Sequence, residues 1–247
     1  MIEFDATTSG NYSQDGDYSF NHTCSGNQRI LIVGIVNNAA LDEITAVSYN
    51  GVALTKVALG SGAIPGARDY LYYLINPDSG THAVRIQRTN VTGPVFPNAV
   101  SYKGVKQSGQ PDAKVAKSQN TTAFNTAITT VADNCWLTGV FFNAQNKAMT
   151  AAVGTVARAV SDTSHGMFDS NVAKSPAGSY SLGITGPLGM YAALVISLSP
   201  YIAPPTSSPN RTSRKNFNGY LAFVQQFFKH KMAGTTPWAS PVGDLIP

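Results

Sequence analysis

Residues 28–57, QRILIVGIVNNAALDEITAVSYNGVALTKV, decide the fold of this chain. Residues 30–36 are a continuous apolar run, broken only by Gly34 and rich in β-branched side chains. The run is too short to cross a membrane, and it predicts a strand that is buried on both faces. Asn50-Gly51 predicts a type I′ hairpin turn, because both residues tolerate a positive φ. Since such a unit cannot bury its apolar face alone, the stretch predicts an all-β fold with a second sheet packed on the first.

The composition is typical of a turn-rich β protein. Only 12% of the 247 residues are charged, against about 25% in an average soluble domain. The 22 glycines and 14 prolines supply turns between β-prone segments. These segments recur along residues 1–199 and predict one antiparallel β-sandwich of about a dozen strands. Residues 179–184 and 190–198 are predicted as two of the strands, whereas the polar stretch 107–125 is predicted as a long exposed connection.

The excess positive charge lies at the C-terminal end of the chain. Residues 1–200 hold 12 basic and 12 acidic side chains. Residues 201–247 hold five basic side chains and only Asp244, which gives 5 − 1 = +4. A basic segment on a neutral body predicts contact with an acidic surface of protein, nucleic acid or anionic lipid. The alternative is a segment that is only solvated.

Residues 200–247 are predicted to form an arm in three parts, and we call them the arm from here on. Residues 200–216 are a proline-rich basic linker, 217–233 an amphipathic helix and 234–247 an extended tail. Burying four large side chains of the helix is worth roughly 6–12 kcal/mol before ordering entropy, so the stripe needs a surface to cover it. The predicted partner-binding residues are Arg211, Arg214, Lys215, Phe217, Tyr220, Leu221, Val224, Phe227, Phe228 and Trp238.

The two cysteines, Cys24 and Cys135, lie 111 residues apart, each in or beside a predicted strand. The spacing favours two buried free thiols, and a disulfide is the alternative if the two strands are neighbours. The acidic, polar start of the sequence predicts no signal peptide. Since no run of 18 apolar residues occurs, the sequence also predicts no transmembrane segment.

Local motifs for catalysis or metal binding are missing from the sequence. The four histidines are far from one another, and His22 has only Cys24 near it in the sequence, so no set of zinc ligands with the usual spacing occurs. The adjacent acids Asp42 and Glu43 are predicted to point to opposite faces of a strand, which is a poor arrangement for acid/base catalysis. A glycosidase with carboxylates from distant strands stays open, because such a pair needs no local motif. The prediction is a non-enzymatic protein with no metal and no cofactor.

Tyrosines recur in the predicted strands and admit two interpretations. A sugar-stacking platform could form from Tyr18, Tyr49, Tyr70, Tyr72, Tyr73 and Tyr102, with Tyr70 and Tyr72 as the ligand-binding candidates, which would make the chain a carbohydrate-binding or adhesin module. The alternative is structural use, because sandwiches place tyrosines at core edges and interfaces.

Four segments carry a resemblance to a known family. These are VSYNGVALT at 47–55, LYYLI at 71–75, GTHAV at 80–84 and VSYKGV at 100–105. Together they resemble jelly-roll β-sandwich domains of tailed-bacteriophage virion proteins, which also occur in some bacterial surface proteins. The resemblance covers residues 18–199. Its motifs are turns and core positions, and the resemblance implies no catalytic residue.

The resemblance implies a non-enzymatic virion structural protein, as a capsid decoration, minor capsid or tail-associated component. Its expected partners are other virion proteins or copies of itself, with no specific nucleic acid. Its expected location is the virion, after synthesis in the host cytoplasm. Two alternatives remain open: the carbohydrate-binding module, and a membrane-surface protein whose helix at 217–232 lies in the lipid interface.

Overall fold

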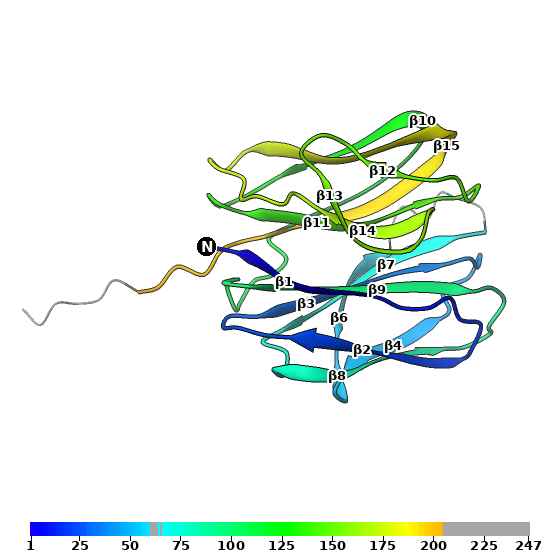
Figure 1. Ribbon diagram of the computed structural model, residues 1–247, viewed down its shortest axis with the longest axis horizontal. Helices are drawn as coiled ribbons and strands as arrows, with labels where there is room; N and C mark the ends of the chain where they lie inside the picture. The colour runs from blue at the N-terminus through cyan, green and yellow to red at the C-terminus, as the bar shows by residue number, and fades with distance from the viewer. Residues whose placement is uncertain (60–63, 65, 205–247) are drawn as a thin grey trace, which may run out of the picture. The chain divides into compact units, whose positions relative to one another are not determined.

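The computed structural model describes residues 1–59, 64 and 66–204, and every regular element within them is a β-strand (Figure 1). Residues Met1–Ile202 form one unit. Its strands are β1 (Glu3–Ser9), β2 (Asp17–Cys24), β3 (Ile30–Asn37), β4 (Ile44–Tyr49), β5 (Val52–Ala53), β6 (Thr55–Leu59), β7 (Arg68–Ile75), β8 (Gly80–Arg88), β9 (Val95–Lys103), β10 (Ala113–Thr129), β11 (Trp136–Asn143), β12 (Thr150–Ala151), β13 (Val156–Asp162), β14 (His165–Asp169) and β15 (Ser179–Leu198).

The strands form three antiparallel sheets that are stacked in layers (Figure 1). The central sheet has the order β1-β9-β3-β7-β6. One face of it packs on the sheet β2-β8-β4-β5, and the other face packs on the sheet β10-β15-β11-β14-β13. We call the sheet β2-β8-β4-β5 the inner-loop sheet and the sheet β10-β15-β11-β14-β13 the outer sheet, although each of them covers one face of the central sheet. The chain alternates between the central and inner-loop sheets from β2 to β9, so neither sheet is made from one continuous segment.

Strand β3 is buried along its whole length because it lies between β9 and β7 in the central sheet. Side chains at alternate positions enter different cores. Ile30, Ile32 and Val36 face the outer sheet, and Leu31 and Val33 face the inner-loop sheet. The prediction of a strand buried on both faces at 30–36 is therefore confirmed.

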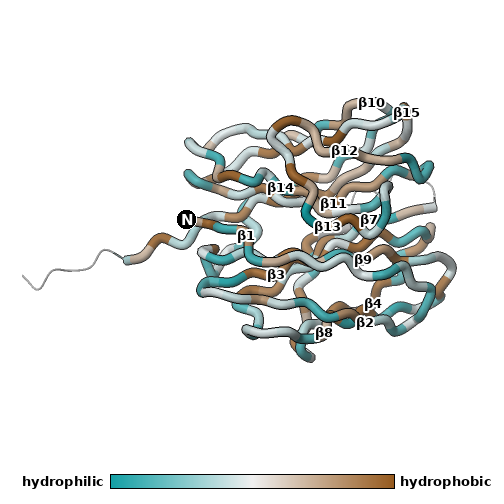
Figure 2. The backbone as a smooth tube through the Cα atoms, viewed as in Figure 1, coloured by the Kyte–Doolittle hydropathy of each residue, from teal (hydrophilic) through white to brown (hydrophobic). Residues whose placement is uncertain are grey.

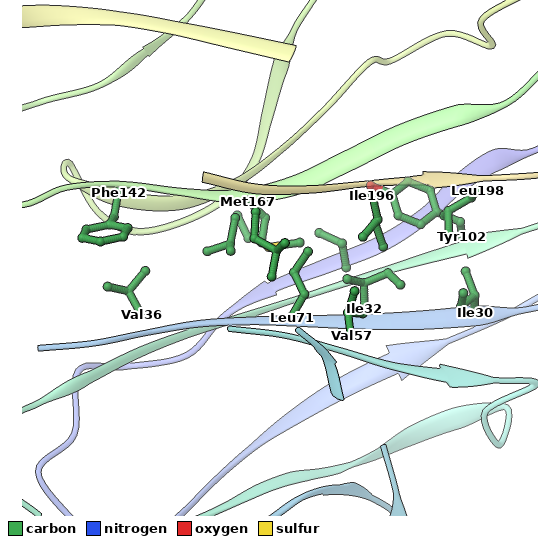
Figure 3. Close-up of a cluster of buried hydrophobic side chains, with 14 of the residues drawn as sticks. Ile30, Ile32, Val36, Val57, Leu71, Tyr102, Phe142, Met167, Ile196 and Leu198 are labelled. Carbon is green, nitrogen blue, oxygen red and sulfur yellow. The ribbon is translucent and has the colours of Figure 1, made fainter. Parts of the chain in front are cut away.

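The core between the central and outer sheets is closely packed with hydrophobic side chains (Figure 3). Ile32 and Leu71 rise from the central sheet towards Ile196 and Met167 of the outer sheet. Gly34 lets the two layers approach here, since a Cβ at this position would lie 2.2 Å from the Met167 sulfur. Figure 2 shows hydrophobic segments along strands of all three sheets, and their buried side chains form the cores of the body.

The predicted hairpin turn between β4 and β5 is present. Asn50 and Gly51 have φ values of 48° and 79°, as a type I′ turn requires. Both cysteines are buried and free, so the predicted pair of thiols is also confirmed. Cys24 lies in the core beside the inner-loop sheet.

Strand β15 is bent, and its partner β10 bends with it. Ser179–Leu198 is one strand of 20 residues, where the sequence predicted two. Gly186 and Gly189 permit the bend, because a Cβ on them would lie 2.4 Å from the Tyr191 hydroxyl and 2.6 Å from the Asn143 amide nitrogen. The half of the β10–β15 hairpin beyond the bend folds back over the outer sheet. A third core forms there from Phe124, Ile128, Leu182 and Ile184 against Leu137, Phe141 and Val195.

The polar stretch 107–125 was predicted as an exposed connection, and that prediction is wrong. Most of it belongs to β10, which runs for 17 residues along the edge of the outer sheet. The architecture is an all-β stack of antiparallel sheets, as expected for a β-sandwich protein. The predicted helix at 217–233 lies outside the described residues.

Candidate interaction site at the root of the arm

The ten partner-binding residues predicted in the arm lie outside the described residues. These are Arg211, Arg214, Lys215, Phe217, Tyr220, Leu221, Val224, Phe227, Phe228 and Trp238. The described part of the arm is its root, residues 200–204, which follows directly on β15.

The root of the arm is fixed to the end of β9 by backbone hydrogen bonds. The Tyr201 N–H donates to the Gly104 carbonyl at 2.8 Å, and the Lys106 N–H donates to the Ser199 carbonyl at 3.0 Å. The sequence predicted a composition change at Pro200 but gave no sign of this pairing, because its two partners are about a hundred residues apart. The arm therefore leaves the body at a defined point, where the central and outer sheets meet.

The N-terminus lies at the same place. Gly104 has a φ of 73°, and a Cβ there would lie 2.1 Å from the Met1 carbonyl oxygen. Only glycine fits this crossing, which explains the glycine of the VSYKGV segment. Met1 and Ile202 are 80% and 81% exposed, so large apolar side chains are presented to solvent on both chain segments around Gly104.

A pocket of about 410 Å³ opens beside the root. Tyr201 and Ile202 form one wall, and Lys106 and Gln107 contribute from the segment after β9. The Gln107 amide is oriented by its own hydrogen bonds, since its Nε2 donates to the Val105 carbonyl at 2.7 Å. The remaining lining residues are Ser108, Ala132, Ser199 and Pro200.

A polar cluster around Cys135 lies under this pocket. The Cys135 thiol donates to the Ala132 carbonyl at 3.0 Å and lies 3.3 Å from a carboxylate oxygen of Asp112. Ser199 donates to the same carboxylate oxygen. Burial raises the pKa of Cys135, and the charge of Asp112 acts in the same direction. A thiol held protonated in this way is a poor nucleophile, so the cluster is a structural support for the root.

Tyr70 and Tyr72, the candidates for sugar stacking, are both inside the protein. They are 0% and 4% exposed, because β7 lies in the central sheet and both rings point into the core beside the inner-loop sheet. Their rings stack on each other with centroids 6.4 Å apart. Neither ring is presented at the surface where a glycan could stack on it.

Serine, histidine and aspartate meet at the turn between β13 and β14. Ser164 Oγ and Asp162 Oδ1 lie 2.9 and 2.7 Å from the same ring nitrogen of His165, Nδ1. A catalytic triad needs its serine and its carboxylate on opposite ring nitrogens. The His165 ring is also buried and stacked on Phe96, with centroids 4.0 Å apart. The cluster therefore closes the turn and does not form a nucleophilic site.

A second polar network links the central and outer sheets. The Tyr102 hydroxyl lies 3.0 Å from Thr138 Oγ1 and 3.1 Å from Asp169 Oδ2, and Arg158 Nε donates to the same Asp169 oxygen at 2.7 Å. The Arg158 guanidinium also lies 4.2 Å from the centroid of the Phe4 ring. Burial raises the pKa of Tyr102, and the charge of Asp169 adds to the effect.

The adjacent acids Asp42 and Glu43 were predicted on opposite faces of a strand, but they lie just before β4 and differ in burial. Asp42 forms a surface ion pair with Lys56 at 2.9 Å, whereas Glu43 forms a fully buried ion pair with Arg88 at 2.8 Å. Burial alone would raise the pKa of Glu43, but hydrogen bonds from Thr92, Arg88 and Asn37 outweigh it and lower the pKa. Both carboxylates are thus engaged in structural contacts.

The described residues contain no group of three or more histidine, cysteine, aspartate or glutamate side chains placed to hold a metal ion. They also contain no helix with the length and hydrophobicity needed to cross a bilayer. No protein-family model matches the chain, and a search of curated proteins finds no similar sequence.

Proposed function

We propose that this chain is a non-enzymatic structural protein of a virion, with a stacked β body and a C-terminal arm that attaches it to neighbouring subunits. The proposal is supported first by the resemblance of residues 47–55, 80–84 and 100–105 to turn and core motifs of phage virion domains. The finer assignment to the jelly-roll class rests on the same motifs. The neutral body and the +4 arm supply the second support.

The observation that carries the proposal is the fixed root of the arm. The Tyr201–Gly104 and Lys106–Ser199 hydrogen bonds anchor the chain just before its basic, aromatic segment. An arm with an anchored root starts from a known position on the body, so less chain entropy is lost when its predicted helix meets a partner. The exposed apolar side chains of Met1 and Ile202 add to the surface that a partner could contact beside the root of the arm.

The test compares the full chain with a variant that carries Phe217→Ser, Phe227→Ser and Phe228→Ser. We expect the wild-type chain to form a discrete oligomer by light scattering and to be a stoichiometric component of purified virions by mass spectrometry. The variant should be monomeric with an unchanged melting temperature. A monomeric wild-type chain that is also missing from purified virions would contradict the proposal.

The carbohydrate-binding alternative has less support. Its ligand-binding candidates, Tyr70 and Tyr72, are buried in the core, and so are Tyr49 and Tyr102 from the same predicted platform. A glycan array with the wild-type chain separates the two functions, since only the binding module is expected to give a saturable signal.

A further inference from the structure

Strand β10 has an edge that faces away from the outer sheet. Its other edge pairs with β15 from Ala113↔Ser197 to Thr129↔Ser179. In the described part of the chain, β15 is the only strand that pairs with it. A free edge of this length presents a row of backbone donors and acceptors to solvent, and such a row is a template for another strand.

The register shows which backbone groups face the free edge. The Ala144 N–H donates to the Met190 carbonyl, which directs the even-numbered residues in the second half of β15 towards β11. The N–H of Asp112, the residue just before β10, donates to the Ser197 carbonyl of β15. The backbone groups of the odd-numbered residues of β15 therefore face β10. Because each of these is opposite an odd-numbered residue of β10, the free backbone groups belong to Lys114, Ala116, Ser118 and Asn120.

At the bend and just beyond it, the protein's own side chains occupy backbone groups of this edge. Lys117 Nζ donates to the Asn125 carbonyl at 2.7 Å. The Thr121 hydroxyl accepts from the Ala123 N–H at 3.2 Å and donates to the Ala123 carbonyl at 3.1 Å. Before the bend, the segment from Lys114 to Asn120 is therefore an uninterrupted open part of the edge. The side chains of Ala116 and Asn120 are exposed, and that of Ser118 is half-buried.

This segment is positively charged, and neither of its lysines forms an ion pair with an acid in the part of the chain that the structure describes. β10 contains Lys114 and Lys117 and no acidic residue. Lys114 Nζ donates to the Val57 carbonyl at 3.1 Å, and Lys117 Nζ donates to Asn125, so both ammonium groups bind neutral oxygens. The two lysines lie on opposite faces of the strand, one towards the central sheet and one towards the folded-back hairpin. A strand with carboxylates on both faces would complement them.

The same charges disfavour pairing of the edge with a second copy. Antiparallel pairing of two β10 edges would bring the lysines of one copy beside those of the other, and like charges on neighbouring strands are destabilising. A pocket of about 340 Å³ opens where the segment begins, lined by Lys114, Ala113 and Asp112 on one side and by Lys56 and Tyr73 on the other. This pocket offers space for a side chain of an added strand beside the Lys114 ammonium group.

We propose that the free edge of β10, from Lys114 to Asn120, is a strand-addition site for an extended acidic segment of a partner protein. The backbone hydrogen bonds of Ala116, Ser118 and Asn120 would supply affinity, and the two lysines would select for carboxylates. The site does not use the arm, so the proposal stands or falls independently of the virion function.

The test uses the full chain and the synthetic peptide acetyl-TEVTEVT-amide, whose glutamates lie on opposite faces of an extended strand. We expect the peptide to slow hydrogen exchange at the amides of Ala116, Ser118 and Asn120, as measured by NMR. The control peptide acetyl-TKVTKVT-amide should bind at least about tenfold more weakly. Equal binding of the two peptides would overturn the assignment to an acidic partner.

A pair of variants isolates the edge itself. Ser118→Pro removes an N–H that faces solvent and breaks no bond to β15, and proline is tolerated on edge strands. It should weaken acidic-peptide binding about tenfold or more, whereas Ser118→Ala should retain it. If Ser118→Pro does not fold, the double variant Lys114→Gln, Lys117→Gln should show the same loss. Unchanged peptide binding in the folded variants would overturn the proposal, as would edge amides that are already protected in the free chain.

Discussion

Glu43 and Arg88 form the most deeply buried ion pair among the described residues, with both side chains 0% exposed. Removing one partner leaves the other charge buried without compensation. We therefore expect Glu43→Ala to lower the free energy of unfolding by about 3–5 kcal/mol, measured by urea denaturation at pH 7. The surface acid beside it gives a matched control, because Asp42→Ala should cost less than about 1 kcal/mol. A small loss in Glu43→Ala would mean that water reaches Arg88 in solution.

Gly34 sets the distance between the central and outer sheets. A Cβ at this position would meet both the Met167 sulfur and the Val140 Cβ, the latter at 3.1 Å. Gly34→Ala is thus expected to overpack the core and to destabilise the protein by about 1–3 kcal/mol in denaturant titrations. Gly16→Ala is the control, because its nearest neighbour would be an ordinary contact at 3.6 Å. Equal stability of the two variants would show that the layers can separate without cost.

His22 makes the stability of the fold depend on pH. Burial lowers the pKa of His22 to about 4, and the nearby Asp5 only partly opposes this. The unfolded chain binds the histidine proton near pH 6.5, whereas the folded chain does not bind it until about pH 4. His22 therefore does not destabilise the fold above pH 6.5. As the pH drops from about 6.5 to 4, the unfolded chain gains a proton that the folded chain does not, and the free energy of unfolding falls by ~3 kcal/mol in all.

The measurement is the free energy of unfolding at pH 7 and pH 5 for the wild-type chain and for His22→Gln. The variant should lose less stability than the wild-type chain between these two values. Burial also lowers the pKa of His165, so some dependence on pH should remain. Parallel slopes for the two proteins would contradict the assignment to His22.

At the scale of elements, strands that carry a strong local signal were predictable. The β-branched run at 30–36 and the Asn50-Gly51 turn were both confirmed, because each depends on residues close in sequence. Strand β10 was missed for a physical reason. An edge strand with one exposed face needs few apolar residues, and Lys114, Lys117 and Asn120 therefore gave it the composition of a loop.

No local sequence pattern could predict the bend in β15. The sequence GPLG at 186–189 suggests a turn between two strands, but the chain continues in the same hairpin after bending. What decides the outcome is the third core, where residues from both halves of the hairpin pack together. Local patterns also could not show that Tyr70 and Tyr72 are buried. They do not reveal that the inner-loop sheet covers this face of the central sheet.

The bend gives a prediction of its own. Gly186→Ala would place a Cβ 2.5 Å from the Ala148 carbonyl and 2.4 Å from the Tyr191 hydroxyl. We expect a loss of about 1–3 kcal/mol by thermal or chemical denaturation, with faster hydrogen exchange in the folded-back half of the hairpin. Gly178→Ala, whose Cβ would meet nothing closer than 3.9 Å, should be neutral. A neutral Gly186→Ala would imply that the bend is looser in solution.

At the scale of the whole molecule, residues 1–202 are expected to fold without the rest of the arm. Met1–Ile202 forms one unit with three cores of its own. A fragment of these residues should unfold cooperatively in a thermal melt and should be a monomer by light scattering. If the full chain self-associates while the fragment does not, the arm is an intermolecular anchor. A fragment that fails to unfold cooperatively would make the arm part of the fold.

The order of the sheets depends on pairings between distant segments, which is why the sequence predicted layers but not their number. β1 pairs with β9, and β10 pairs with β15 across the whole of β11 to β14. Hydrophobic patterning reveals which face of a strand is buried but not which strand lies beside it. Chains dominated by such non-local contacts generally fold slowly, so the body is expected to refold in milliseconds to seconds or more slowly.

The continuity of β15 with the root of the arm has a mechanical consequence. The strand lies between β10 and β11, and it is hydrogen-bonded to both of them. Tension applied through the arm would pull β15 along its own axis, so the bonds on both sides would carry the load together and could not open one at a time. A partner that pulls on the arm along this axis would therefore load the hydrogen bonds on both sides of β15 in shear.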